Sequence, residues 1–312
     1  MTALLPGGNV DLHSVEVVQA ARRRPRRRQA LVWAGSALAL VVAFLARVLL
    51  GDFTFTIPDA VRIVLGEDIP GASFILMETK LPRAVLAVLV GLALGVSGAI
   101  FQMALCNPLA SPDIIGVAMG ASAAAAFAII ELGQEGVPVA LWGSAGAVLM
   151  AVIVRVIGGS GNRLVLVGVG ATVALQAVVQ YLFTRADEYD AHVALRWLTG
   201  SVGEATWSQV RLVTIGLLVL MPLTALLVRS LGIAELGRDL ATGLGVGQRR
   251  TDLLLLVAVL LVALAVAVAG PVSFVAFLSG PIARALNRGR SRDPIRTVRG
   301  AGYAFNEQFE RA

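Results

Sequence analysis

Apolar residues along this chain gather in long blocks rather than in the narrow stripes of helices that lie half in water. The hydrocarbon core of a bilayer needs roughly 20 apolar residues per helix. Eight blocks approach or reach that length, namely Ala30–Leu50, Ala84–Leu105, Ile114–Ile130, Val137–Val156, Leu164–Phe183, Leu212–Val228, Leu253–Gly270 and Val272–Leu286. The eighth is short and is interrupted by Gly280 and Pro281. The pattern predicts an all-α, polytopic membrane protein with about eight spanning helices.

The composition points the same way and narrows the possible chemistry. Of 312 residues, 57% are hydrophobic and 15% are charged, whereas soluble domains average about 25% charged residues. Buried helices of a large soluble protein would need polar faces to enclose them, and the chain lacks such faces. The single cysteine, Cys106, allows no internal disulfide, and His13 and His192 are far apart. We therefore expect no metal and no cofactor.

Basic residues are divided unevenly between the two sides of the predicted bundle. With the N-terminus in the cytoplasm, 19 of the 26 Lys and Arg residues fall on the inner side and six on the outer side. This excess follows the positive-inside rule, so we expect a multi-pass protein of the cytoplasmic (inner) membrane with a cytoplasmic N-terminus. The run Arg22–Arg28 could also bind nucleic acid, but topology explains it, and we expect no nucleic-acid partner.

The sequence divides into a basic N-terminal tail (1–29), a transmembrane domain (30–286) and a basic C-terminal tail (287–312). The C-terminal tail contains no span. Its segment PIRTVRGAGYAF resembles the last hairpin of winged-helix response regulators, yet twelve residues cannot form a DNA-binding domain. We interpret this tail as the scar of a fusion or frameshift, with a chance likeness as the alternative.

Three segments are not explained by crossing a membrane. The turn Asn107–Pro112 joins two spans, and irregular backbone there must be buried in protein or line a cavity. The run Gly270–Arg284 contains two Gly/Pro interruptions, which predict a broken or half-length helix of the kind that transporters use. The loop 229–252 has apolar residues at helical spacing, followed by three glycines. Its short amphipathic helix either docks into a partner's groove or lies on the lipid surface.

Small residues are far more frequent inside the spans than ionisable ones. Gly91 with Gly95, and Gly116 with Gly120, lie four residues apart and predict close helix packing. A secondary transporter working alone would need ionisable residues within its spans, and these spans hold almost none. The sequence also lacks a GxxxxGK[ST] loop, so we expect a chain that is not an enzyme.

A series of motifs in a fixed order carries a specific family resemblance. They are LPRAVLAVLVGLALGVSGAIFQMALCNPLASPDIIGVAMGAS, LVLVGVGATVALQAVVQYL, RWLTGSVGEATWSQV, LATGLGV and GPVSFVAFLSGPIARAL. From Ala30 to Leu286 the chain resembles the FecCD/BtuC-type permeases of iron-siderophore and vitamin B12 ABC importers, with wording most similar to the ferric-enterobactin branch. The resemblance implies a BtuC-like bundle that carries ferric siderophores of the catecholate type. The family usually has ten spanning helices and this chain shows eight, so a truncated, transport-inactive remnant is the alternative.

The resemblance also implies partners and the residues that meet them. A separate ABC ATPase subunit would hydrolyse ATP and dock on the cytoplasmic loop 229–252. Its contacts would be Glu235, Arg238, Asp239, Thr242 and Gly245. An extracytoplasmic siderophore-binding protein would dock on Lys80 and Arg83, although Lys80 replaces the family's usual arginine and so loses a bidentate carboxylate contact. A second permease subunit, identical or paralogous, would complete the transporter in the lipid bilayer.

The same likeness assigns residues to the transport pathway. Asn107, Pro108 and Leu109 correspond to the cytoplasmic end of the pathway, where the family's gating residues lie. Thr172 and Gln176, in the fifth predicted span, would face the pathway. Hydrogen bonds between helices explain these two polar residues about as well.

Overall fold

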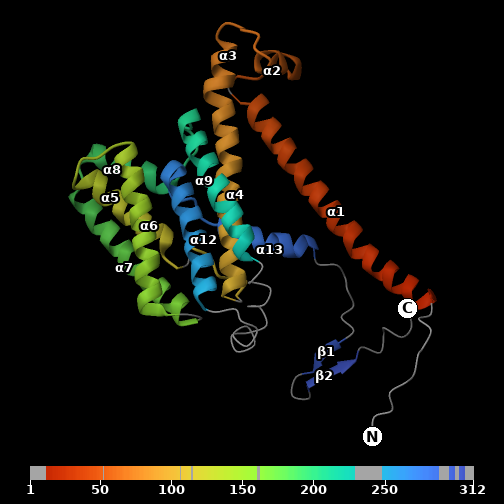
Figure 1. Ribbon diagram of the computed structural model, residues 1–312. Coiled ribbons are helices and arrows are strands. Elements are labelled where there is room, and N and C mark those ends of the chain that lie inside the picture. The colour runs from red at the N-terminus through yellow and green to blue at the C-terminus, as the bar shows by residue number, and fades with distance from the viewer. Residues whose placement is uncertain are drawn as a thin grey trace. The chain divides into compact units, whose positions relative to one another are not determined.

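The computed structural model describes the backbone of residues 12–51, 53–105, 107–113, 115–159, 162–228, 248–287, 295–298 and 302–305. The chain forms two compact units, Ala43–Pro281 and Met1–Val42 with Ile282–Ala312. In chain order the elements are α1 (Leu12–Leu49), α2 (Ile57–Val64), α3 (Ala72–Phe74), the π-helix η1 (Ile75–Lys80), α4 (Leu81–Ala104), α5 (Val117–Ile130), α6 (Val137–Gly158), α7 (Asn162–Arg185), α8 (Glu188–Thr199), α9 (Trp207–Val228), α12 (Gln248–Ala269), α13 (Val275–Asn287), β1 (Ile295–Val298) and β2 (Gly302–Phe305) (Figure 1).

All eight apolar blocks predicted from the sequence are helical. Six of the described helices are long and apolar enough to cross a membrane, and two apolar helices, Val117–Ile130 and Val275–Leu286, are shorter. The prediction of an all-helical polytopic bundle is thus confirmed, but its boundaries change. The second span is continuous from Ala72 to Ala104, 33 residues in all, and it contains a π-helical turn. Helices α2 and α8 lie outside every predicted block.

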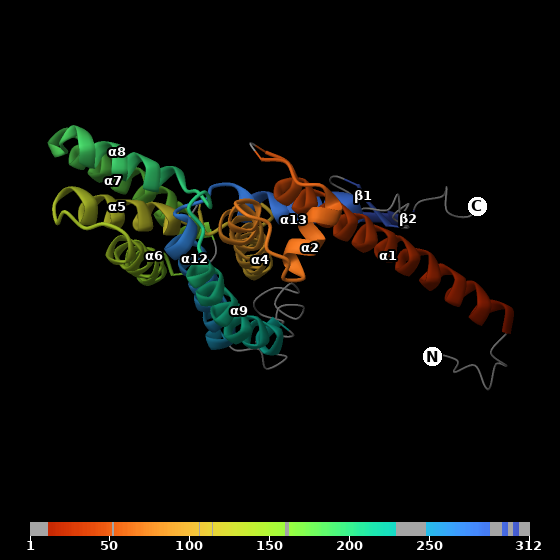
Figure 2. The ribbon, with the colours of Figure 1, turned by 90° about the horizontal axis from the view of Figure 1, so that it is seen from above.

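Helix α12 is the central helix of the larger unit. It packs against α4, α6 and α9, and the view from above shows it lying between them (Figure 2). Of its apolar span 56% is buried, the largest share among the six long spans. A helix that is apolar on every side is stable only when surrounded by apolar neighbours. Hydroxyls join it to them: Ser97 Oγ donates to Ala258 O (2.8 Å) and Ser144 Oγ to Ala263 O (3.2 Å).

Small residues allow the closest helix contact, but only some of the predicted positions do so. A Cβ on Gly120 would lie 2.6 Å from Gly146 O, and one on Gly146 would lie 2.4 Å from Gly120 O, so α5 and α6 touch backbone to backbone as predicted. Gly116 lies before α5 with φ +85° and faces α7. Gly95 makes only ordinary contact with Ser279, and Gly91 faces open space. The packing prediction for Gly91 is therefore wrong.

The run that follows α12 breaks once rather than twice. Helix α12 ends before Gly270, and α13 begins at Val275 as a 13-residue, half-length helix, as predicted. The second break, expected at Gly280 and Pro281, is wrong, because α13 continues through Pro281. Proline has no N–H to donate to the carbonyl four residues earlier. Gln102 Nε2 of α4 donates to that carbonyl, Phe277 O, at 3.1 Å, and so takes the place of the missing donor.

The strands of the described chain lie in the C-terminal tail. Strands β1 and β2 pair antiparallel, with Ile295 opposite Phe305 and Val298 opposite Gly302. Both strands fall within the segment PIRTVRGAGYAF, whose origin stays a prediction. The two strands belong to the smaller unit.

We predict that Gly98→Ala destabilises the protein strongly. A Cβ at Gly98 would lie 1.9 Å from Ala276 O and 2.6 Å from Ala276 C, and backbone atoms cannot rotate away. Overpacking of this kind costs about 1–3 kcal/mol or more. A lower midpoint of thermal unfolding in lipid nanodiscs would show it. Gly91→Ala, in the same helix but facing open space, is the matched control and should leave the midpoint unchanged. Equal midpoints for the two variants would contradict the close contact.

Candidate functional site

A cavity of about 400 Å³ opens where three segments distant in sequence come together. They are the connector between α4 and α5, the middle of α7, and the start of α13. The lining residues are Ser111, Asp113, Val169, Thr172, Val173, Ser273, Phe274 and Phe277. The wall is mainly apolar, with three hydroxyl groups and one carboxyl group. Such a wall suits a bulky ligand held by a few oriented polar contacts.

The connector between α4 and α5 is built by its own hydrogen bonds. Asn107 Oδ1 accepts from Leu109 N (2.9 Å), and Asn107 O accepts from Ala110 N (3.1 Å), which is the turn that asparagine favours. Asn107 N in turn donates to Gln102 O at the end of α4 (3.1 Å). Ser111 is fully buried. The second half of the connector, from Ala110 to Pro112, is therefore buried in protein and borders a cavity, as predicted for a non-helical segment between spans, whereas Pro108 and Leu109 are exposed.

The predicted pathway residues divide into two groups. Thr172 lines the cavity, and its Oγ1 donates to Gly168 O within α7 (2.8 Å). Asn107, Pro108 and Leu109 shape the turn beside the cavity but are not among its lining residues, and Leu109 is 60% exposed. Gln176 lies one helical turn beyond Thr172 on the exposed surface of α7. The structure thus brings the turn and Thr172 to one place, and their role in gating stays a prediction.

Asp113 is the ionisable group of the cavity wall. It lies in the connector between the span 72–104 and helix α5, outside both helices. Its carboxylate accepts a hydrogen bond from the backbone N–H of Phe274, while burial is the larger influence and raises its pKa from 3.8 to about 6. Its Oδ2 is buried without a hydrogen-bond partner among the described residues. The sequence gives one signal of this site, a carboxyl group directly after Pro112 and at the edge of an apolar block.

Phe274 adopts a backbone conformation that non-glycine residues rarely occupy. Its φ is +68°, which costs about 1–3 kcal/mol and persists only where neighbours enforce it. Phe274 O accepts from Leu278 N in the first turn of α13 (2.8 Å), and its N–H bonds to Asp113. The connector therefore holds the strained start of α13 through one carboxyl group. Sequence reasoning missed Phe274, because no local pattern marks a strained phenylalanine.

Lys80, expected on the outer surface for docking, is buried. Only 6% of it is exposed. Its Nζ donates to Leu50 O (2.9 Å) and to Phe53 O, and it lies 5.1 Å from the centre of the Phe55 ring. The ammonium group therefore holds the segment after α1 against η1. Arg83 lies one turn further along the same span and is partly exposed, and its Nε has no hydrogen-bond partner among the described residues.

The predicted ATPase contacts Glu235, Arg238, Asp239, Thr242 and Gly245 lie outside the described residues. The structure does describe the end of their loop, where α12 begins. There Arg155 of α6 forms a bidentate ion pair with Asp252, with Nη2 2.8 Å from both Oδ1 and Oδ2. Arg155 Nη1 also donates to Gly159 O (2.8 Å). The pair ties the last turn of α6 to α12 just after its first turn. Sequence reasoning missed it, because the two residues are 97 positions apart.

Within the described ranges no three His, Cys, Asp or Glu side chains come close enough to hold a metal ion. The site combines a partly apolar cavity, a buried carboxyl group and a strained helix start. These features suit binding and a change of conformation.

Comparison with known proteins gives consistent matches over most of the chain. The model of the FecCD transport family matches residues 39–304. The chain is 34% identical over 254 residues to the ferric enterobactin transport system permease protein of Escherichia coli K12, covering 80% of this chain and 77% of that protein. It is 38% identical over 258 residues to the achromobactin transport system permease protein of Dickeya dadantii, covering 80% and 74%.

A solved structure extends the comparison to the fold. It is described as an inward-facing conformation of a metal-chelate type ABC transporter. The two structures match with a TM-score of 0.69 at 22% sequence identity, covering 83% of this chain and 87% of the other. The helical bundle is therefore of the type found in ABC transporter permeases, including the BtuC-like arrangement expected from the motifs.

We predict that Asp113→Asn stabilises the protein at neutral pH. The folded-state pKa of about 6 exceeds the ordinary value of 3.8, so the unfolded chain releases its proton first and stability falls as pH rises from about 4 to about 6. Asparagine removes this cost and still accepts the Phe274 N–H. The gain should be about 3 kcal/mol at neutral pH and shrink toward pH 4, as measured by thermal unfolding over a pH series. A gain that is independent of pH would contradict the raised pKa, and Asp113→Ala, which loses the acceptor, should not reproduce the gain.

Proposed function

The chain belongs to the FecCD transport family and is a permease subunit of an ABC importer for iron chelates, and we propose that its cargo is a ferric siderophore of the catecholate type. The observation that carries the finer proposal is the 34% identity with a ferric enterobactin permease across 80% of this chain. The motifs WLTGS and AFLSGPIAR support it. Because relatives named for achromobactin and for ferric citrate match equally well, the chelate type has to be decided by transport.

We propose that the cavity between the α4–α5 connector, α7 and α13 is a section of the transport path. Its apolar wall offers a bulky chelate few strong contacts, which suits a path that must release its cargo. Thr172 would contact the cargo, and Gln176 would continue the path along α7. The turn Asn107–Leu109 would act as the gate by moving the connector that carries Asp113. The strained Phe274 favours this proposal, because strain at a helix start provides a second conformation at low cost.

We propose three protein partners and an orientation of the chain in the membrane. With the N-terminus in the cytoplasm, an ATPase subunit docks on the loop 229–252 and supplies the energy of ATP hydrolysis, and a second permease subunit completes the path. A siderophore-binding protein docks on the opposite side, where the partly exposed Arg83 is the basic contact. Lys80 would support that docking surface from beneath, since its ammonium holds the Leu50–Phe55 segment in place. The alternative is a transport-inactive remnant of such a permease.

We predict uptake of a ferric catecholate siderophore when the chain is expressed with its neighbouring binding-protein and ATPase genes in cells lacking their own permease. Radiolabelled iron should enter as the catecholate complex and much less as ferric citrate or a ferric hydroxamate. A version extended by the two C-terminal helices of a relative is the control. Uptake by the extended version alone would establish the remnant, and equal uptake of all chelates would refute the catecholate specificity.

We predict that reversing two charges in the cytoplasmic loop, Arg238→Glu with Asp239→Lys, abolishes co-purification with the ATPase subunit. Docking of a short helix into a groove depends on a few oriented contacts, and reversed charges meet like charges. Arg163→Glu, an exposed basic residue on the same side of the membrane, is the matched control and should retain the complex. An intact complex with the double variant would contradict the proposed docking site.

A further inference from the structure

The outer segment between α1 and α4 carries a helix whose apolar face has no partner within the chain. Helix α2 exposes Ile57, Val61, Val64 and the following Leu65, each between 50% and 80% exposed. Spacings of four, three and one residues place them on one side of a helix. Ile63 is the residue of α2 that packs inward, at 3% exposure. The smaller apolar side of α2 thus packs against the protein, and its larger apolar side faces outward.

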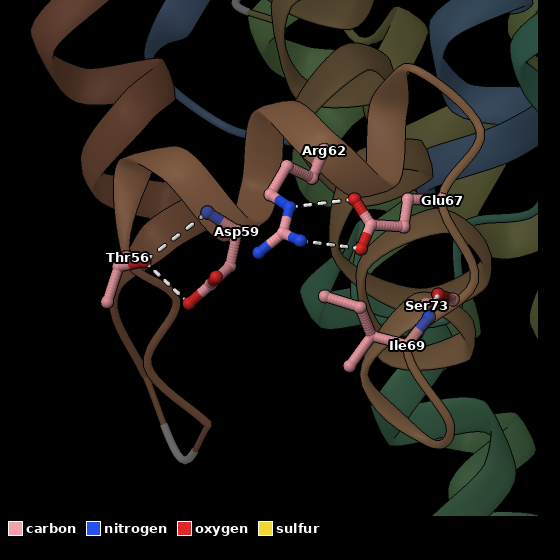
Figure 3. A network of polar contacts seen from close by, with 6 residues as sticks. All are labelled: Thr56, Asp59, Arg62, Glu67, Ile69 and Ser73. Atoms are coloured by element: carbon pink, nitrogen blue, oxygen red, sulfur yellow. Dashed lines mark hydrogen bonds and ion pairs between the residues drawn. The ribbon is translucent and has the colours of Figure 1, made fainter.

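Four polar side chains of this segment form two pairs. Thr56 caps α2: its Oγ1 accepts from Asp59 N (3.3 Å) and donates to Asp59 Oδ2 (2.6 Å). Arg62 donates to both oxygens of Glu67, at 2.7 and 2.8 Å. Figure 3 shows the Arg62 guanidinium turned toward Glu67 and the Thr56–Asp59 pair at the other end of the helix. The ends of α2 are thus fixed, and the charge of Arg62 is balanced by that of Glu67.

The start of α2 is held at the outer end of a membrane span. Phe55 N, two residues before the helix, donates to Leu49 O (2.9 Å), the last residue of α1. Phe55 and Ile63 share a small apolar cluster with Val48, Leu76 and Ala84, so α2 packs at the ends of the first and second spans. Figure 1 shows α2 beside α3 at one end of α4. Helix α2 therefore lies at the level of the bilayer surface along the axis of these spans.

We propose that α2 is an interfacial helix whose face of Ile57, Val61, Val64 and Leu65 inserts into the outer leaflet of the membrane. The end of α1 that belongs to the larger unit exposes Leu45 at 44%. Because this end is part of an apolar span, its exposed side meets lipid close to where α2 begins. Interfacial helices bury their apolar side about 5–10 Å into the boundary between headgroups and acyl chains. An eight-residue helix would bind weakly alone, but the Phe55–Leu49 bond and the Lys80 contacts keep it at the surface.

A protein occupant fits this face less well than lipid does. Encounter with a binding protein is steered by charge, and the exposed face of α2 carries none, because Arg62 is paired with Glu67. Insertion of α2 would fix the height of η1 and Arg83 above the bilayer. The proposal concerns the membrane contact of the chain and does not depend on which chelate is transported.

The test measures the depth of single labelled positions in the full-length chain in nanodiscs. In a Cys106→Ser background, a fluorescent label is placed at Val61→Cys, with Glu67→Cys on the paired polar side as the matched control. Brominated lipids should quench the label at position 61 by about half or more, as expected for a side chain in the headgroup–acyl boundary, while aqueous iodide should quench only the label at 67.

Each other outcome would overturn the membrane contact. Quenching of position 61 by iodide and not by brominated lipid would place the face in water. Protection from both quenchers only after adding the binding protein would identify that protein as the occupant. Self-quenching between labels at position 61, lost on dilution with unlabelled chain, would show that the face meets a second copy.

Discussion

The approach of α4 to α13 at Gly98 is the contact on which the candidate site depends. With no side chain at Gly98, the backbone of α13 reaches α4 at Ala276, and one turn later Gln102 supplies the hydrogen bond that Pro281 cannot make. In lipid an unpaired carbonyl costs several kcal/mol, so a half-length helix with an internal proline is stable only beside such a donor. The position of α13 then sets where Phe274 and Phe277 meet the connector, and so sets the cavity.

The cavity concentrates unfavourable features that the rest of the bundle avoids. A buried carboxyl group with a raised pKa and a phenylalanine with φ +68° are joined by one hydrogen bond. Each costs free energy, and the tight contacts around α12 and between α5 and α6 offset that cost elsewhere. Strain kept in this way at a junction of three segments is typical of sites that change conformation. The same junction joins the turn assigned to gating with the helix assigned to the pathway.

Hydropathy and motif order predicted the eight apolar helices and the family, because both are properties of consecutive residues. What they missed depends on contacts between distant residues. A helix break was expected at Pro281, because proline lacks an N–H. The break does not occur, because the donor that replaces this N–H belongs to Gln102, 175 positions away from Phe277 in the sequence. Lys80 was expected to be exposed because its motif suggests docking, whereas the carbonyls of Leu50 and Phe53 surround its ammonium. Helix α2 is too short for a hydropathy window. The sequence shows Asp113 as a polar residue beside the turn, but it does not show the hydrogen bond between Asp113 and Phe274.

The ion pair of Arg155 and Asp252 gives a stiff joint to the end of the bundle where α6 stops and α12 begins. Both side chains are more than a third exposed, so the pair adds little to the free energy of unfolding, yet its bidentate geometry resists rotation. A force applied to the loop before α12 would rotate α12 and α6 together. Because α6 contacts α5 backbone to backbone at Gly120, this rotation would also move α5. Such a rotation would reach Gly116 and the connector before α5, which carries Asp113. It would decide whether the hydrogen bond between Asp113 and the Phe274 N–H is kept or broken.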